Sequence, residues 1–154
     1  MMCKIITFTG FLQTGKTTSA NFIESTRYSF AAPIKHIART DFRWNEKKDG
    51  LGRKLLQEIG SVGRNYYSDI WVDKLRVDLM NDSFSHVITI DDLRYSNEAE
   101  MLKELDAMII RINRPGYGSS NHESEKGIPD IYIDRTICNN GTLLELKEKV
   151  LQCL

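Results

Sequence analysis

Short apolar runs alternate with amphipathic segments along the chain, and this alternation predicts the fold. Apolar runs at residues 5–9, 86–90 and 107–112 predict buried strands, and weaker runs predict strands at 28–30 and 131–138. Apolar positions three or four residues apart predict helices between these strands, at 15–24, from Pro33 onward, and at 51–66, 68–79, 97–105 and 142–154. Strands that alternate with helices predict an α/β fold, in which helices cover both faces of one parallel sheet.

Polar residues at the start of three of these segments predict where the helices begin. Ser68 is expected to cap the helix that carries Trp71. Asn97 with Glu100, and Thr142 with Glu145, have the spacing of capping boxes, in which a side chain and a backbone N–H bind each other reciprocally.

Composition narrows the class of protein without naming a function. The 154 residues contain 41% hydrophobic and 27% charged residues, which is ordinary globular usage, and we expect one domain over residues 1–154. The net charge is zero, so the chain lacks the excess of basic residues that is typical of proteins that bind nucleic acid or anionic membranes. The three cysteines have no C-x-x-C spacing, and no signal peptide or membrane span precedes the first strand. These features predict a soluble cytoplasmic protein with reduced thiols.

The strongest chemical signal is the segment from Gly10 to Thr17, which fits the phosphate-binding pattern G-x-x-x-x-G-K-[ST] without a mismatch. It follows a predicted strand and opens a predicted helix, as this loop requires. The glycines allow backbone N–H groups to surround a phosphate, Lys16 can reach the β- and γ-phosphates, and the Thr17 hydroxyl can bind Mg²⁺. We expect Lys16 to face a phosphate and to make no core contacts. The sequence therefore predicts ATP and Mg²⁺ as cofactors, bound by these residues: Gly10, Gln13, Thr14, Gly15, Lys16, Thr17 and Thr18.

A carboxylate for the metal is expected at Asp91–Asp92, directly after the strand at 86–90. Both carboxylates cannot point into the site if strand geometry continues, and the residues alone leave the choice open. A GTPase is the first alternative, because residues 49–52 match D-x-x-G. No apolar strand precedes that segment and no N-K-x-D follows it, so we set this alternative aside.

The segment 113–130 lacks apolar periodicity and is rich in glycine and proline. Loops of this length in compact domains are commonly functional, and phosphoryl transfer needs a lid that excludes water. We therefore predict that residues 113–130 form a lid, with Arg114 at its base.

Several further segments resemble bacteriophage deoxynucleoside monophosphate kinases, a family of P-loop kinases. The resemblance runs in order from Gly10 to about Leu146. It rests on these segments: F-A-A-P-I-K at 30–35, L-Q-E-I-G at 56–60 with Arg64 and Trp71, D-L-R-Y-S-N-E-A-E at 92–100, R-I-N-R-P-G at 111–116 and H-E-S-E at 122–125. Ser96 stands where the family commonly has proline, so the base preference is not carried over.

The resemblance implies a three-layer αβα P-loop kinase with about five parallel strands, which transfers phosphate from ATP to a deoxynucleoside 5′-monophosphate. It implies that Asp92, the aspartate of D-x-R, serves the metal, and that Lys16, Asp92, Arg94 and Arg114 are catalytic. Asn139 and Asn140 lie where related kinases hold adenine. A helical region at about 41–81 would bind the acceptor, whose expected contacts are Lys35, Gln57, Arg64, Trp71, Arg94, His122 and Glu125. At helical spacing, Trp71 fits a core role equally well.

Two other classes of function stay open on the sequence. One is a related P-loop kinase that acts on another small phosphorylated metabolite or on a modified base in DNA. The other is a regulatory module that binds ATP without transfer, although Arg114 in the predicted lid favours a kinase. The partners expected are small-molecule substrates, with no nucleic acid and no membrane, and a homodimer is left open. If the chain is viral, its location is the host cytoplasm.

Overall fold

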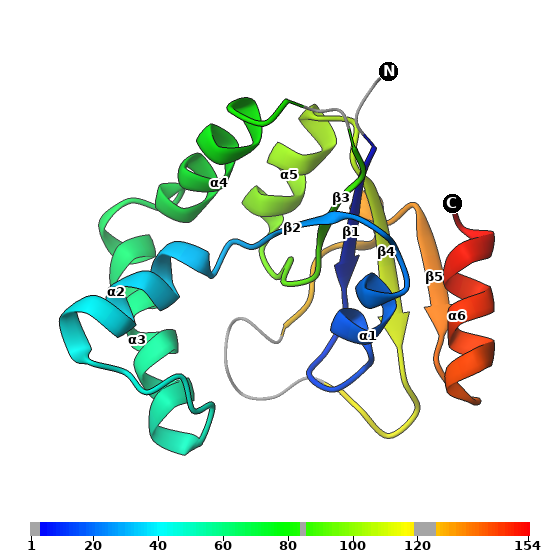
Figure 1. The fold of residues 1–154 in the computed structure, drawn as a ribbon, viewed down its shortest axis with the longest axis horizontal. Helices are drawn as coiled ribbons and strands as arrows, with labels where there is room; N and C mark the ends of the chain where they lie inside the picture. Colours follow the sequence, from blue (N-terminus) through cyan, green and yellow to red (C-terminus); the bar gives the residue numbers. More distant parts are fainter. Residues whose placement is uncertain (1–3, 84–85, 119–125) are drawn as a thin grey trace. The chain divides into compact units, whose positions relative to one another are not determined.

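The computed structural model describes residues 4–83, 86–118 and 126–154, and the chain divides into two compact units. Residues 29–82 form a unit of helices, here called the helical unit. The residues up to Tyr28 and from Ser83 onward form the sheet unit, which contains every strand of the described chain (Figure 1).

Five parallel strands form the sheet: β1 (Ile5–Thr9), β2 (Thr26–Tyr28), β3 (Ile88–Ile90), β4 (Met108–Asn113) and β5 (Arg135–Cys138). Their order across the sheet is β2-β3-β1-β4-β5. The central strand β1 pairs with β3 through Ile5↔Ile88 and with β4 through Ile6↔Met108, and all of its residues are buried. A strand buried on both faces is expected only where helices cover both faces. The parallel sheet predicted from the sequence is confirmed.

Helices α1 (Lys16–Asn21) and α6 (Leu143–Gln152) cover one face of the sheet. Phe8 of β1 and Ile110 of β4 form one buried cluster there with Ala20, Leu146 and Val150 of these helices. The connection from β1 to β2 runs toward the β2 edge of the sheet, whereas the connection from β3 to β4 runs toward the β5 edge. Right-handed crossovers therefore place α5 (Ser96–Glu104) on the opposite face. The sheet unit is a three-layer α/β fold, as predicted (Figure 1).

Several boundaries in the sheet unit differ from the prediction, among them those of α5, β2 and β5. Helix α5 begins after Tyr95, because the buried carboxylate of Glu98 accepts hydrogen bonds from the backbone N–H groups of Arg94 and Tyr95, at 2.8 and 3.1 Å. The proposed box of Asn97 with Glu100 is therefore wrong. Strand β2 lies at 26–28 instead of 28–30, and β5 begins at Arg135 because Asp130–Tyr132 form a 3₁₀ turn, η2.

The capping box of α6 is confirmed. The Thr142 hydroxyl accepts a hydrogen bond from the Glu145 N–H at 3.2 Å, and the Glu145 carboxylate accepts one from the Thr142 N–H at 2.6 Å.

The helical unit consists of α2 (Ala32–Phe42), α3 (Gly50–Tyr66) and α4 (Ile70–Met80). Pro33 lies in the first turn of α2, as predicted, whereas α4 is preceded by Asp69 and not by Ser68. Glycines bring α3 against α4, since a Cβ atom built on Gly63 would lie 2.4 Å from Cζ2 of Trp71.

Asp49 caps α3, and its carboxylate accepts a hydrogen bond from the Gly52 N–H at 2.8 Å. The D-x-x-G match at 49–52 is thus a helix start. In the described part of the chain, no helix combines the length and the apolar character needed to span a bilayer.

Candidate active site

The loop between β1 and α1 takes a shape that only glycine fits at two positions. Gly10 has a φ of 141°, and a Cβ atom there would lie 2.3 Å from the Ile112 carbonyl oxygen. Gly15 has a φ of 108°, and its Cβ atom would lie 2.9 Å from Nδ2 of Asn139. Thr14 between them is fully buried, and its hydroxyl donates to the Phe11 carbonyl at 2.9 Å. The two glycines of the pattern are required by close backbone approach and by positive φ.

Lys16 is buried against this loop, and the sequence did not predict this burial. Its ammonium donates to the carbonyl oxygens of Gly10 and Phe11, at 2.7 and 2.6 Å, and the residue is 8% exposed. A buried ammonium needs acceptors, and the carbonyls of the loop supply them. Lys16 therefore supports the loop in addition to carrying its positive charge.

A cavity of about 310 Å³ lies beside the loop, at the small end of the usual range for ligand sites. It brings together four of the predicted ATP contacts, Gln13, Gly15, Thr18 and Asn139, with Arg114 from the end of β4. Gly141, in the same turn as Asn139 and Asn140, also lines it, and the sequence did not predict the rest of its lining, Leu143 and Leu146. These residues follow the last strand directly, where the apolar stripe of α6 begins, and that position is the signal that could have identified them.

Asn139 and Asn140 connect the end of β5 to its surroundings. The side-chain amide of Asn139 donates to the Thr14 carbonyl at 2.9 Å, and the Asn139 N–H donates to the Asn113 carbonyl at 2.7 Å. The Asn140 side chain accepts a hydrogen bond from Lys149 at 3.2 Å. Asn139 thus lines the cavity and also holds the phosphate-binding loop.

Arg114 lies at the start of the predicted lid and against the loop. Its Nη1 donates to the Gln13 carbonyl at 3.2 Å, and its guanidinium lies 4.5 Å from the centroid of the Tyr117 ring. At the other end of the predicted lid, Ile128 is buried, and Arg111 of β4 donates to its carbonyl oxygen at 2.6 Å. Arg111 also pairs with Asp130. Ile128 and Asp130 therefore attach this end of the segment to the sheet. His122 and Glu125 lie outside the described residues.

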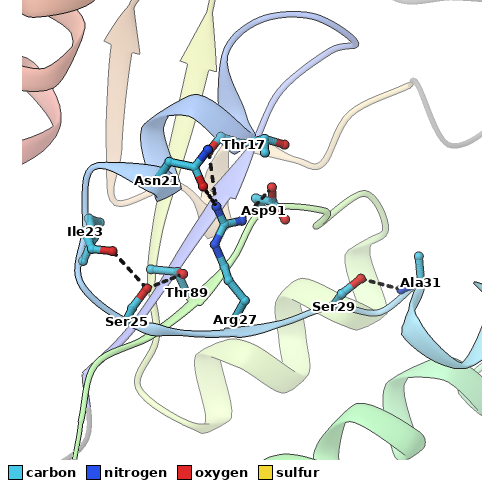
Figure 2. A network of polar contacts seen from close by, with 9 residues as sticks. All are labelled: Thr17, Asn21, Ile23, Ser25, Arg27, Ser29, Ala31, Thr89 and Asp91. Carbon is cyan, nitrogen blue, oxygen red and sulfur yellow. Dashed lines mark hydrogen bonds and ion pairs between the residues drawn. The ribbon is translucent and has the colours of Figure 1, made fainter. Parts of the chain in front are cut away.

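The two acidic residues after β3 have different surroundings. Asp91 forms an ion pair with Arg27 of β2, with 2.9 Å between Oδ2 and Nη1, and the same guanidinium donates to the Thr17 carbonyl at 3.3 Å (Figure 2). Asp91 is therefore linked through Arg27 to the first turn of α1. The preference for Asp92 at the metal rests on the resemblance alone and stays a prediction.

The segment that carries Asp92 and Arg94 is held at the peptide group between Leu93 and Arg94. The Thr9 hydroxyl at the end of β1 donates to the carbonyl of the buried Leu93 at 2.9 Å. Glu98, which is 4% exposed, accepts from the Arg94 N–H at 2.8 Å. This role of Glu98 was not predicted from the sequence, because Tyr95, three residues before it, is not a usual capping residue.

Four predicted contacts to the acceptor lie on the helical unit: Lys35 on α2, Gln57 and Arg64 on α3, and Trp71 on α4. Gln57 is exposed, and Lys35 and Arg64 are half-buried. Trp71 is 3% exposed, and its indole N–H donates to the Gly60 carbonyl at 3.0 Å. We therefore assign Trp71 to the core of the helical unit and not to base stacking.

The donor set suits a metal that is held mainly by phosphate. Among the described residues no three His, Cys, Asp or Glu side chains gather at one place. Thr17 is exposed at the start of α1, and the carboxylates near it follow β3. Mg²⁺ is commonly bound by one or two protein oxygens together with substrate phosphates and water, so these residues fit it.

Comparison with solved structures supports the fold. TT1252 from Thermus thermophilus superimposes with a TM-score of 0.60 at 15% identity, over 99% of this chain and 96% of that one. A dephospho-CoA kinase from Campylobacter jejuni gives a TM-score of 0.50 at 14% identity, over 99% and 96%. At these identities the likeness concerns the fold alone.

Comparison with other sequences shows the family. A protein of Acanthamoeba polyphaga mimivirus, provisionally named a deoxynucleotide monophosphate kinase, is 30% identical over 91% of this chain and 90% of its own length. The deoxynucleotide monophosphate kinase of Enterobacteria phage T4 is 30% identical over 64% of this chain, and the match spans 43% of that protein. The family model described as deoxynucleotide monophosphate kinase matches residues 38–150. The chain therefore belongs to the deoxynucleotide monophosphate kinase family.

Proposed function

We propose that the protein transfers the γ-phosphate of ATP to a deoxynucleoside 5′-monophosphate and so forms a deoxynucleoside diphosphate. The observation that carries this proposal is the phosphate-binding loop from Gly10 to Thr17 with the cavity beside it, in a chain of this family. The names of the mimivirus and phage T4 relatives favour a deoxynucleotide as the acceptor.

In this proposal the sheet unit binds ATP. The backbone N–H groups of the loop surround the β- and γ-phosphates, and the Lys16 ammonium moves from loop carbonyls to phosphate oxygens. The adenine ring occupies the cavity, where Leu143 and Leu146 offer it apolar contact. Thr17 and a carboxylate after β3 would hold Mg²⁺, which neutralises charge on the phosphates when it is bound.

Arginines account for the rest of the proposed chemistry. Phosphoryl transfer demands little covalent work from the protein, which has to position the reactants and neutralise the charge that moves. Arg114 is the proposed cation at the transferring phosphoryl group. Arg94 and Arg64 are the proposed contacts to the acceptor phosphate, because a guanidinium binds two phosphate oxygens at once. Lys35, Gln57, His122 and Glu125 are carried as further acceptor contacts on the family resemblance.

No general base is needed in this scheme. The attacking oxygen belongs to a phosphate that is already anionic, so no proton has to be removed before attack. Water must nevertheless be kept away from the γ-phosphate, and that is the role proposed for the segment 113–130.

The test is a coupled assay of ADP release with ATP and each of the eight natural nucleoside and deoxynucleoside monophosphates. We expect ADP release that depends on a deoxynucleoside monophosphate and is lost in the Lys16→Ala variant. A further sample with duplex DNA as acceptor tests the kinase that acts on a modified base. ATP binding without ADP release for any acceptor would instead support the regulatory module.

A further inference from the structure

Arg27 of β2 makes three contacts within the sheet unit through its two terminal nitrogens. Nη1 lies 2.9 Å from the Asp91 carboxylate, and Nη2 donates to the Asn21 side chain at 2.6 Å and to the Thr17 carbonyl at 3.3 Å. Figure 2 shows the guanidinium between α1 and the end of β3. The ion pair is partly shielded from water, since the side chains of Arg27 and Asp91 are 34% and 16% exposed.

The strands fix where this guanidinium lies. Arg27 is paired in register with Thr89, and Asp91 follows two positions after Thr89, so alternation brings Asp91 to the side of the sheet on which Arg27 lies. Next to this pair, the hydroxyls of Ser25 and Thr89 are hydrogen-bonded at 2.7 Å. Ser25 also donates to the Ile23 carbonyl at 3.3 Å, and Figure 2 shows these contacts beside Arg27. Arg27 is thus held on a strand that Ser25 anchors to β3 two residues before it.

We propose that Arg27 is a positioning residue that holds the Asp91 carboxylate at a set distance from the first turn of α1. It would thereby shape the metal–nucleotide site without touching ATP. This inference rests on the proposed function, because it takes Thr17 as a ligand of Mg²⁺ bound with ATP. It also makes Asp91, and not Asp92 alone, a part of that site.

A positioning role follows from the two groups that Arg27 joins, the Thr17 carbonyl and the Asp91 carboxylate. One guanidinium joins the backbone of Thr17 to a carboxylate that is 74 positions away in the sequence. Charge-assisted hydrogen bonds of this kind are strong and directional. Partners that orient the direct ligands of a metal affect its binding although they do not contact it.

The test is calorimetric titration of ATP into the unchanged protein and into Arg27→Met, once with Mg²⁺ and once with EDTA. Methionine keeps much of the length of the side chain and removes all three contacts. We expect ATP affinity to fall roughly tenfold in Mg²⁺ and to stay the same in EDTA. Equal losses in both conditions, or no loss in either, would overturn the proposal.

Arg27→Lys and the double variant Arg27→Met/Asp91→Asn separate positioning from a general effect on folding. Lysine can keep the contact to Asp91 and should restore part of the Mg²⁺-dependent affinity. If Arg27 acts through Asp91, the double variant should lose no more affinity than Asp91→Asn alone. Additive losses would contradict the mechanism. If Arg27→Met does not fold, the same criteria apply to Arg27→Gln, which removes the charge paired with Asp91, and unchanged affinity in that variant would overturn the proposal.

Lys103→Met is the matched control. Lys103 also forms an ion pair in the sheet unit, 2.8 Å from Asp134, with 37% and 36% of the two side chains exposed. Asp134 directly precedes β5 and so lies at the N-terminal ends of the parallel strands, whereas the phosphate-binding loop lies at their C-terminal ends. This variant should bind ATP like the unchanged protein in both conditions. Because ATP binding needs no acceptor, the Arg27 result can stand even if no monophosphate is phosphorylated.

Discussion

Two cationic side chains of the site are bound to carbonyl oxygens of the loop after β1. Lys16 donates to the Gly10 and Phe11 carbonyls, and Arg114 donates to that of Gln13. In the proposed reaction each cation exchanges a carbonyl for a phosphate oxygen. A substitution at either position therefore changes the loop as well as the charge, and activity has to be measured together with stability.

Lys16→Ala should abolish most of the transferase activity. Removal of one well-placed electrostatic stabiliser lowers kcat by about 100-fold or more. The variant should fold, but with a lower Tm, because it loses two hydrogen bonds to the loop. Steady-state kinetics and thermal unfolding of the same preparation measure both effects. Near-normal turnover would show that the segment 10–17 is not the phosphate-binding loop of this enzyme.

Arg114→Ala should reduce kcat strongly and change KM for ATP much less. A cation that acts mainly in the transition state contributes roughly 3–5 kcal/mol to its stabilisation, as arginine fingers do. An interaction made mainly in the transition state adds little to ground-state binding. The contact of Arg114 to Gln13 is a single long hydrogen bond of 3.2 Å, so its loss should disturb the loop little. Arg135→Ala, on β5, is the control. A large rise in KM for ATP with unchanged kcat would assign Arg114 to ground-state binding.

At the scale of single residues, the sequence predicted those site residues whose partners lie near them in the chain. Gly10, Gly15 and Lys16 were found because the pattern places them within eight positions. Arg27 was missed because its partner Asp91 is far away in the sequence, and strand pairing alone brings them together. The burial of Lys16 was also missed, since nothing local indicates which carbonyls a lysine will meet.

At the scale of elements, the alternation of strands and helices was sufficient to predict the parallel sheet. The hydrophobic period fixes the kind of each element, and crossover rules fix the direction of the strands. The ends of elements depend on individual hydrogen bonds that a pattern does not show. Glu98 sets the start of α5, and Asp134 accepts from the Ile109 N–H at 2.8 Å just before β5.

Gly63→Ala should destabilise the helical unit although alanine favours helix. The added Cβ atom would lie 2.4 Å from the Trp71 ring, and forced overpacking costs about 1–3 kcal/mol. The gain in helix propensity is only about 1 kcal/mol. Gly50→Ala, at the first residue of the same helix, meets nothing within 4 Å and should leave stability nearly unchanged. Urea unfolding followed by tryptophan fluorescence compares the two, and equal midpoints would contradict the packing described.

Asp134→Asn should lower stability at neutral pH, and the difference should shrink in acid. Burial raises the pKa of Asp134, but the hydrogen bond from the Ile109 N–H and the contact with Lys103 outweigh it, so the pKa lies below its ordinary value. A lowered pKa stabilises the fold above the unfolded value, and this contribution is lost as pH falls through the folded value. The pair is more than one-third exposed, so we expect an effect of about 1 kcal/mol at pH 7. Denaturant unfolding of both proteins between pH 7 and 3 measures it.

At the scale of the whole molecule, the proposed contacts to the two substrates are distributed over the two units. The described ATP contacts belong to the sheet unit, whereas Lys35, Gln57 and Arg64 belong to the helical unit. The sequence predicted an acceptor-binding region at 41–81, inside the helical unit of residues 29–82. It did not reveal that these residues pack together as a separate compact unit, because the glycine contacts of α3 with Trp71 are tertiary.

Hydrogen exchange should report the two substrates separately. ATP with Mg²⁺ should slow amide exchange in the loop at 10–17 and after β5 at 139–146, because ligand binding stabilises the segments that it contacts. A deoxynucleoside monophosphate alone should slow exchange in α3. The control is the Arg39→Ala variant, which loses an exposed ion pair with Glu46 in the helical unit. The monophosphate should slow exchange in α3 of this variant as it does in the unchanged protein. Protection of the sheet unit alone by the monophosphate would reject the acceptor contacts proposed on α3.

The position of β1 in the sheet has a consequence for synthesis of the chain on the ribosome. β1 emerges before both of its neighbours, β3 and β4, which begin at Ile88 and Met108. Gly10 is shaped by the Ile112 carbonyl, and the Thr14 carbonyl is held by Asn139. The nucleotide loop is therefore translated before the segments that give it its shape. A nascent chain that ends before Asn139 carries the whole motif without the contacts that complete the loop.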